Sequence, residues 1–137
     1  MHVKNTLAPQ DVARAAAIDE AVLGSNAREG YIRSVAENHG LSVATLDGEI
    51  QAFCCLDARY FFEKPFVSLL IVAPEARRLG LGAALLAQAC DGRAEVWTST
   101  NRSNAPMRRL LDKAGWRFCG ELTGFDAGDP ERFYKTG

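Results

Sequence analysis

A strongly apolar stretch, followed at once by a glycine-rich turn, constrains the fold of this chain more than any other feature. Residues 66–72 read Phe-Val-Ser-Leu-Leu-Ile-Val, and Pro74 ends the stretch. A short and almost continuous apolar run predicts a central strand that is covered on both faces. Gly80 and Gly82 then open a helix-forming segment that runs to Cys90. This order of strand, turn and helix indicates an α/β fold.

Local signals elsewhere predict further helices and strands. Asn26 with Glu29 resembles a capping box at the start of a helix, and Asp47-Gly48 is typical of a two-residue hairpin turn. Asn104 is a favourable N-cap for a last helix, which ends at Gly115. Besides the central strand, which we expect over residues 66–73, the expected strands cover residues 3–7, 41–46, 49–56, 94–100, 116–122 and 132–135.

Length and charge exclude several classes of protein. The 137 residues are enough for one domain, and we expect a single domain over residues 1–137. The net charge of −1 disfavours nucleic-acid binding, and no apolar stretch is long enough to cross a bilayer. The first residues do not resemble a secretory signal, so we expect a cytoplasmic protein. The four cysteines show no metal-ligand spacing, and we expect no metal.

The glycine turn has the features of an anion-binding site. The first amides of a helix lack internal acceptors and carry partial positive charge, and Gly80 and Gly82 keep side chains away from them. Arg77 and Arg78 add full positive charge. A Walker A loop would need Gly-Lys-Ser or Gly-Lys-Thr, and a dinucleotide fingerprint would need glycine where Leu85 stands. The turn therefore suits a pyrophosphate, although two glycines could also serve only tight helix packing.

Two motifs together resemble the GNAT superfamily of N-acetyltransferases. Residues 77–82, Arg-Arg-Leu-Gly-Leu-Gly, match its Gln/Arg-x-x-Gly-x-Gly/Ala signature, and the preceding Val72-Ala73-Pro74 matches its usual Val-x-Pro. Downstream, Asn104 and the segment 110–116 are similar to its Asn and its aromatic-Tyr-Glu-Lys-x-Gly-Phe helix end. The resemblance extends over essentially the whole chain. It implies a single-domain GNAT-like α/β fold, with a mixed, mostly antiparallel twisted sheet of about seven strands and about four helices.

The same resemblance implies that the chain binds acetyl-CoA and transfers its acetyl group to an unidentified amine by direct attack. Amides of residues 78–83 would hold the pyrophosphate, and the end of the strand at 70–72 would pair with the pantetheine arm. A gap between the strands at 66–72 and 94–100 would admit that arm, and the amide of Leu70 or Val72 would stabilise the oxyanion. The implied cofactor-binding residues are Leu70, Ile71, Val72, Arg77, Arg78, Leu79, Gly80, Leu81, Gly82, Ala83 and Asn104.

The sequence departs from the family at the catalytic positions. Leu111 stands where the family's usual acid is a tyrosine, and neither Phe66 nor Ser68 supplies the carboxylate often found on the central strand. Glu63, just before that strand, is the nearest carboxylate and our candidate for the base. The candidate replacements for the acid are Tyr134 and Tyr60.

These departures leave alternatives open. The chain could be a CoA-binding regulatory module without transferase activity, or a partner-binding α/β domain whose glycine turn serves packing alone. By analogy with the family, Arg28 and Tyr31 could shape the acceptor site, or they could belong to a solvated helix start. The pocket for the acceptor is built from variable loops, so the sequence does not identify the acceptor. Both a monomer and a homodimer are compatible with the sequence.

Overall fold

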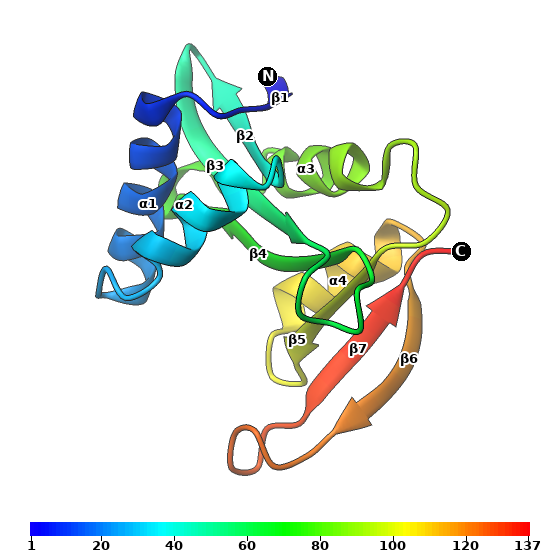
Figure 1. Cartoon of the computed structure of the whole chain (residues 1–137). Helices are drawn as coiled ribbons and strands as arrows, with labels where there is room; N and C mark the ends of the chain where they lie inside the picture. The colour runs from blue at the N-terminus through cyan, green and yellow to red at the C-terminus, as the bar shows by residue number, and fades with distance from the viewer.

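A seven-stranded mixed sheet organises the computed structural model, which describes residues 1–137 (Figure 1). The strand order is β1-β2-β3-β4-β5-β7-β6, and every neighbouring pair is antiparallel except β4 with β5. The strands are β1 (His2–Asn5), β2 (Leu41–Leu46), β3 (Glu49–Asp57), β4 (Phe66–Val72), β5 (Trp97–Asn101), β6 (Arg117–Leu122) and β7 (Glu131–Lys135). The helices are α1 (Pro9–Leu23), α2 (Glu29–Glu37), α3 (Leu81–Cys90) and α4 (Ala105–Lys113), with a 3₁₀ turn at Pro74–Ala76. The expected single α/β domain is confirmed.

Most of the predicted turns and caps are confirmed, and one is wrong. Asp47 and Gly48 have φ of 53° and 82°, as the predicted hairpin between β2 and β3 requires. The capping box at Asn26 does not form, because Arg28 is the N-cap of α2 and no side chain caps that helix. The Asn26 carbonyl instead accepts a hydrogen bond from the Glu29 amide at 3.1 Å, which closes a backbone turn before the helix.

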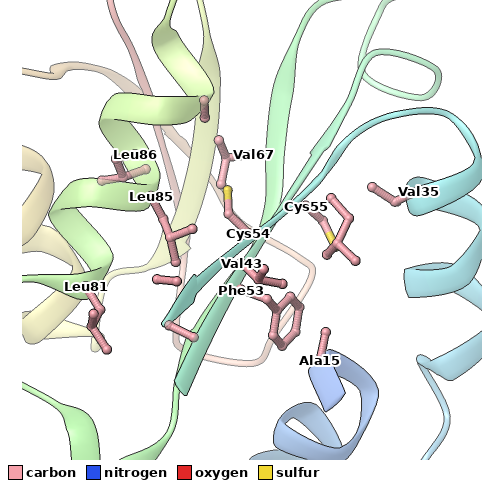
Figure 2. Close-up of a cluster of buried hydrophobic side chains, with 14 of the residues drawn as sticks. Ala15, Val35, Val43, Phe53, Cys54, Cys55, Val67, Leu81, Leu85 and Leu86 are labelled. Atoms are coloured by element: carbon pink, nitrogen blue, oxygen red, sulfur yellow. The ribbon is translucent and has the colours of Figure 1, made fainter. Parts of the chain in front are cut away.

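Helices cover the two faces of the sheet. α1 and α2 pack together on one face of β3, and α3 packs on the opposite face against β2, β3 and β4 (Figure 1). Figure 2 shows the consequence for the two adjacent cysteines of β3: Cys54 lies toward Leu85 of α3, and Cys55 lies toward Val35 of α2. Both thiols are buried, and burial raises the pKa of each. They are core residues on opposite faces, as the alternation of a strand predicts.

β4 is less enclosed than its sequence predicts. Only two of its residues, Phe66 and Val67, pair with β5, and beyond them the two strands separate. Residues 69–72 are consequently only partly buried, although an apolar run of this kind predicts burial on both faces. None of the helices combines the length and the apolar character that a bilayer crossing requires. The opening between β4 and β5 is the feature of the fold that positions the site described next.

Candidate active site

The turn between β4 and α3 presents a row of backbone amides that no protein group accepts. The first hydrogen bond at the start of α3 runs from the Ala84 amide to the Gly80 carbonyl at 3.1 Å. The amides of residues 78–83 donate to no backbone or side-chain acceptor. Such donors at the start of a helix, where the peptide dipoles add positive charge, form a site for an anion. Arg77 and Arg78 are exposed beside them.

The two glycines of this turn have different roles. Gly80 adopts φ of 86°, a left-handed conformation that favours glycine, and it follows Arg78 at φ of 64°. A side chain at Gly80 would meet only the Met1 Cε atom, at 3.8 Å. At Gly82, in contrast, a Cβ atom would lie 3.2 Å from Leu110 Cδ2 of α4. Gly80 therefore shapes the turn, whereas Gly82 permits close packing of α3 against α4.

The exposed edge of β4 continues this row of donors. The Ala73 amide donates to the Gln51 carbonyl of the segment paired with β4, at 2.8 Å. Because amides in a strand point alternately to opposite edges, those of Leu70 and Val72 point away from β3 and into the opening. At the closed end of the opening, the Thr98 hydroxyl of β5 donates to the Val67 carbonyl at 2.8 Å. The predicted gap between these two strands is confirmed.

Asn104 lies at the start of α4, where its predicted capping role is confirmed. Its side-chain oxygen accepts a hydrogen bond from the Met107 amide at 3.2 Å. The Asn104 Nδ2 group donates to no protein acceptor, so it can donate to a ligand while the cap stays formed. Its contact with a cofactor is therefore compatible with the cap and stays a prediction.

The two catalytic candidates lie in different surroundings, and no contact joins them. Glu63 is exposed in the loop before β4, with φ of 57° and no hydrogen bond or ion pair. Tyr134 of β7 is only 1% exposed, and its hydroxyl oxygen accepts the Arg132 Nε–H at 2.9 Å. Leu111, at the position of the family's tyrosine, is fully buried. The roles of Glu63 and Tyr134 stay predictions.

A polar network at the closed end of the opening was not foreseen from the sequence. The Tyr31 hydroxyl of α2 donates to Asp57 Oδ2 at 2.8 Å and lies 2.6 Å from Ser68 Oγ. Arg59 binds the same carboxylate through Nε at 2.9 Å and Nη2 at 3.1 Å. Asp57 is 6% exposed and lies at the end of β3. Asp57 pairs with Phe66, so the network has a carboxylate on the strand next to the β4 positions that lack one.

The network fixes the charge states of its members. Burial alone would raise the pKa of the Asp57 carboxyl, but the hydrogen bonds from Arg59 and Tyr31 outweigh it and hold that pKa below its ordinary value. Burial also raises the pKa of the Tyr31 phenol. At neutral pH, Asp57 is therefore ionised and Tyr31 is protonated. Tyr31 was a candidate from the sequence, whereas Asp57 had no sequence signal because its partners come from distant segments.

Arg28, the other residue considered for the acceptor site, has a structural partner. It binds the buried Asp19 carboxylate of α1 through Nε at 3.0 Å and Nη2 at 2.6 Å. Asp19 is 1% exposed, so the pair links α1 to the start of α2. Arg28 is also the N-cap of α2 and its side chain is 34% exposed, so the ion pair lies at a partly solvated helix start.

Comparison with known proteins gives the same assignment as the geometry. Residues 13–116 match the acetyltransferase (GNAT) family. A solved GNAT-family acetyltransferase from Bacillus cereus ATCC 10987 is 29% identical, with a TM-score of 0.92 over 98% of this chain and 95% of that one.

Two curated relatives match shorter parts of the chain. The 5-NmdU N-acetyltransferase of Pseudomonas phage PaMx11 is 29% identical over 69% of each chain. Streptothricin acetyltransferase from Streptomyces lavendulae is 24% identical over 71% of this chain, which spans only 54% of that relative. The family match covers most of the chain and includes the whole turn with its unpaired amides. The chain therefore belongs to the acetyltransferase (GNAT) family.

Proposed function

We propose that residues 1–137 form an acetyl-CoA-binding N-acetyltransferase domain that moves the acetyl group to a primary amine of a small molecule or a protein. The observation that carries this proposal is two successive groups of unpaired backbone donors, Leu70 and Val72 on the edge of β4 and residues 78–83 at the start of α3. An extended strand edge followed by an anion site matches a linear ligand with a diphosphate at one end, which is the shape of acetyl-CoA.

In this proposal the segments of the site bind successive parts of the donor. Residues 78–83 hold the diphosphate, with Arg77 adding positive charge. Residues 70–72 hydrogen-bond the pantetheine arm as an added strand, and the Asn104 amide group donates to the same arm. The Leu70 amide lies nearest the closed end of the opening, so we assign to it the stabilisation of the oxyanion that develops on the thioester carbonyl.

Transfer requires a neutral amine. Its nitrogen lone pair forms a bond to the thioester carbon, the carbon–sulfur bond breaks, and the sulfur leaves as a thiolate. An alkylamine has a pKa of about 10.4, so a proton must leave the ammonium form before attack. A second proton passes from the attacking nitrogen to the thiolate, which gives an amide and free CoA. Glu63 as the base and Tyr134 as the acid remain our candidates for these proton transfers.

Location and assembly are part of the same proposal. We place the chain in the cytoplasm, in keeping with four cysteines that form no disulfide. It acts as a monomer or as a homodimer. β6 is one of the two edge strands of the sheet, and its free edge offers a surface for pairing.

Two measurements test the function. Titration calorimetry with acetyl-CoA should show binding, and a thiol-reactive dye should report CoA release when a panel of primary amines is added, with the reaction lacking amine as the control for hydrolysis. Absence of acetyl-CoA binding would refute the whole proposal. Binding without thiol release toward any amine would instead identify a CoA-binding module.

A further inference from the structure

The structure holds a polar network on the acceptor side of the opening, and the binding of acetyl-CoA leaves this network without a role. We propose that Ser68 Oγ accepts a hydrogen bond from the attacking amine and positions it, while Tyr31 and Asp57 act as positioning residues that orient Ser68. This inference rests on the proposed transferase function, because it assigns the contact for the second substrate.

The number of protons in the network defines the direction of each hydrogen bond. Tyr31 has one hydroxyl proton and donates it to Asp57 Oδ2 at 2.8 Å. The Ser68 hydroxyl must therefore be the donor in the 2.6 Å contact with the Tyr31 oxygen. The alternative acceptor for Ser68, the Cys55 carbonyl, lies farther away, at 3.4 Å. Both protons point toward the carboxylate, which leaves the lone pairs of Ser68 Oγ available for a donor.

A negative charge at the far end of this chain strengthens Ser68 as an acceptor. Asp57 carries its charge on a side chain that is 5% exposed, and hydrogen bonds in such a buried chain polarise one another. The lone pairs of Ser68 consequently favour an N–H donor with partial or full positive charge. A primary amine, whether as ammonium before deprotonation or as the neutral nucleophile, has N–H groups to donate. The neutral amine keeps its lone pair free for attack while one of its N–H groups donates to Ser68.

A β-bulge places Ser68 at the right point of β4. The register between β3 and β4 shifts at Cys55 and Leu56, which pair with Leu69 and Val67 and leave Ser68 as the extra residue. Val67 lies on the side of α3 (Figure 2), and Leu70 Cδ2 also faces α3, 4.0 Å from the position of a Cβ atom at Gly82. Regular alternation would put residues three apart on opposite faces, so the bulge leaves Ser68 and Leu69 together on the side of α2, where Ser68 Oγ contacts Tyr31.

This placement brings the amine, held at Ser68, and the thioester carbonyl, held at the Leu70 amide, to neighbouring positions on β4. Ser68 faces the α2 side, and the Leu70 amide two residues later faces the opening where the thioester carbonyl is held. An amine bound at Ser68 therefore approaches the carbonyl from the face opposite α3. The amine thus reaches this part of β4 from the α2 side, and the thioester reaches it through the opening between β4 and β5.

Asp57 does not act as the proton acceptor in this arrangement. Two guanidinium hydrogen bonds from Arg59 keep the carboxylate ionised, and Arg59 is itself anchored by donation from Nη1 to Ser34 Oγ at 2.8 Å. A carboxylate stabilised in this way has little tendency to take up a proton. The network thus provides a fixed acceptor for the amine, and the proton leaves by another route.

The test compares Ser68→Ala with Ser68→Thr in the full chain. Steady-state rates are measured with a primary amine that the wild-type protein acetylates, together with the Kd for acetyl-CoA. We expect Ser68→Ala to raise KM for the amine or lower kcat/KM by about tenfold to a hundredfold, the range for a hydrogen bond to a charged group. The Kd for acetyl-CoA should not change, and Ser68→Thr should restore most of the activity because it keeps the hydroxyl.

Tyr31→Phe and a control substitution outside the network, Ser42→Ala, separate positioning from general support of the fold. Tyr31→Phe removes the acceptor of the Ser68 proton and should reproduce the amine defect of Ser68→Ala. Ser42 lies on β2 and takes no part in the network, so Ser42→Ala should leave the kinetics for the amine unchanged. A wild-type protein that acetylates amines while Ser68→Ala keeps full kcat/KM would overturn this inference alone. A wild-type protein that binds acetyl-CoA but acetylates no amine would overturn the inference together with the transferase function.

Discussion

Replacing Gly80 with alanine tests the anion site directly, and Gly24 provides a matched control. The two glycines adopt φ of 86° and 87°, so an alanine is strained to the same degree at either position. Neither position is crowded: a Cβ atom meets nothing within 4 Å at Gly24 and only Met1 Cε, at 3.8 Å, at Gly80. The difference is that Gly80 begins α3 at the row of unpaired amides, whereas Gly24 ends α1.

The expected magnitudes follow from this comparison. A residue with a Cβ atom in the left-handed region costs about 1–2 kcal/mol, so both variants should unfold at a temperature lower by several degrees. In Gly80→Ala the turn can relieve that strain only by rotating the amides that bind the diphosphate. The loss of one charge-assisted hydrogen bond corresponds to about 1.5–3 kcal/mol, and we expect the Kd for acetyl-CoA to rise by about tenfold or more. Gly24→Ala should bind acetyl-CoA as the wild type does.

Thermal unfolding without ligand measures the strain, and titration calorimetry with acetyl-CoA measures the affinity. Equal loss of stability with a selective loss of affinity in Gly80→Ala would support the anion site. If Gly80→Ala binds acetyl-CoA with the wild-type Kd, or if both variants lose affinity equally, the assignment of residues 78–83 to the diphosphate is wrong.

Three other substitutions test separate parts of the molecule. Asn104→Ala removes the cap of α4 and should lower the free energy of unfolding by about 1 kcal/mol in urea titrations. A larger rise in the Kd for acetyl-CoA than other cap variants show would support a contact between Asn104 and the cofactor. Hydrogen bonds from Arg102, with those from Arg132, lower the pKa of Glu121 from 4.5 to about 2. The ionised Glu121 should therefore stabilise the wild type above pH 4.5, and this contribution should be lost as the pH falls toward 2. In urea titrations, the free energy of unfolding of Glu121→Gln should depend less on pH over that window. An unchanged pH dependence would show that the carboxylate has no such role. Glu63→Gln should lower the transfer rate mainly near neutral pH if Glu63 is the base, and a flat pH–rate comparison with the wild type would exclude it.

Local sequence signals predicted the elements and the turn that carries the unpaired amides. Asp47-Gly48 and the Asn104 cap each encode a turn or cap within a few residues, and the structure contains both. The order of strand, glycine turn and helix likewise predicted the position of the unpaired amides. These features depend on backbone conformation close to the residue that determines it.

The polar network around Ser68 could not be predicted in the same way. Asp57 and Ser68 meet through Tyr31, a residue 26 positions before Asp57 and 37 before Ser68, and only tertiary packing brings the three together. The bulge at Ser68 carries no glycine or proline signal, so strict alternation does not predict that Val67 and Leu70 share a face. The predicted capping box at Asn26 was wrong for a local reason, because the same residues form a backbone turn in which the Glu29 amide donates to the Asn26 carbonyl.

The brevity of the β4–β5 pairing has a consequence for stability. Two residue pairs are all that join strands β1–β4 to strands β5–β7 within the sheet, so the molecule consists of two half-sheets with a weak seam between them. A molecule that lies in this seam and binds both halves acts as a missing strand and opposes their separation. A free ligand concentration of 100 times Kd adds about 2.7 kcal/mol to the free energy of unfolding, whatever the chemistry of the ligand. If acetyl-CoA is that ligand, as proposed, the resistance of the protein to heat and proteolysis should increase with the concentration of acetyl-CoA.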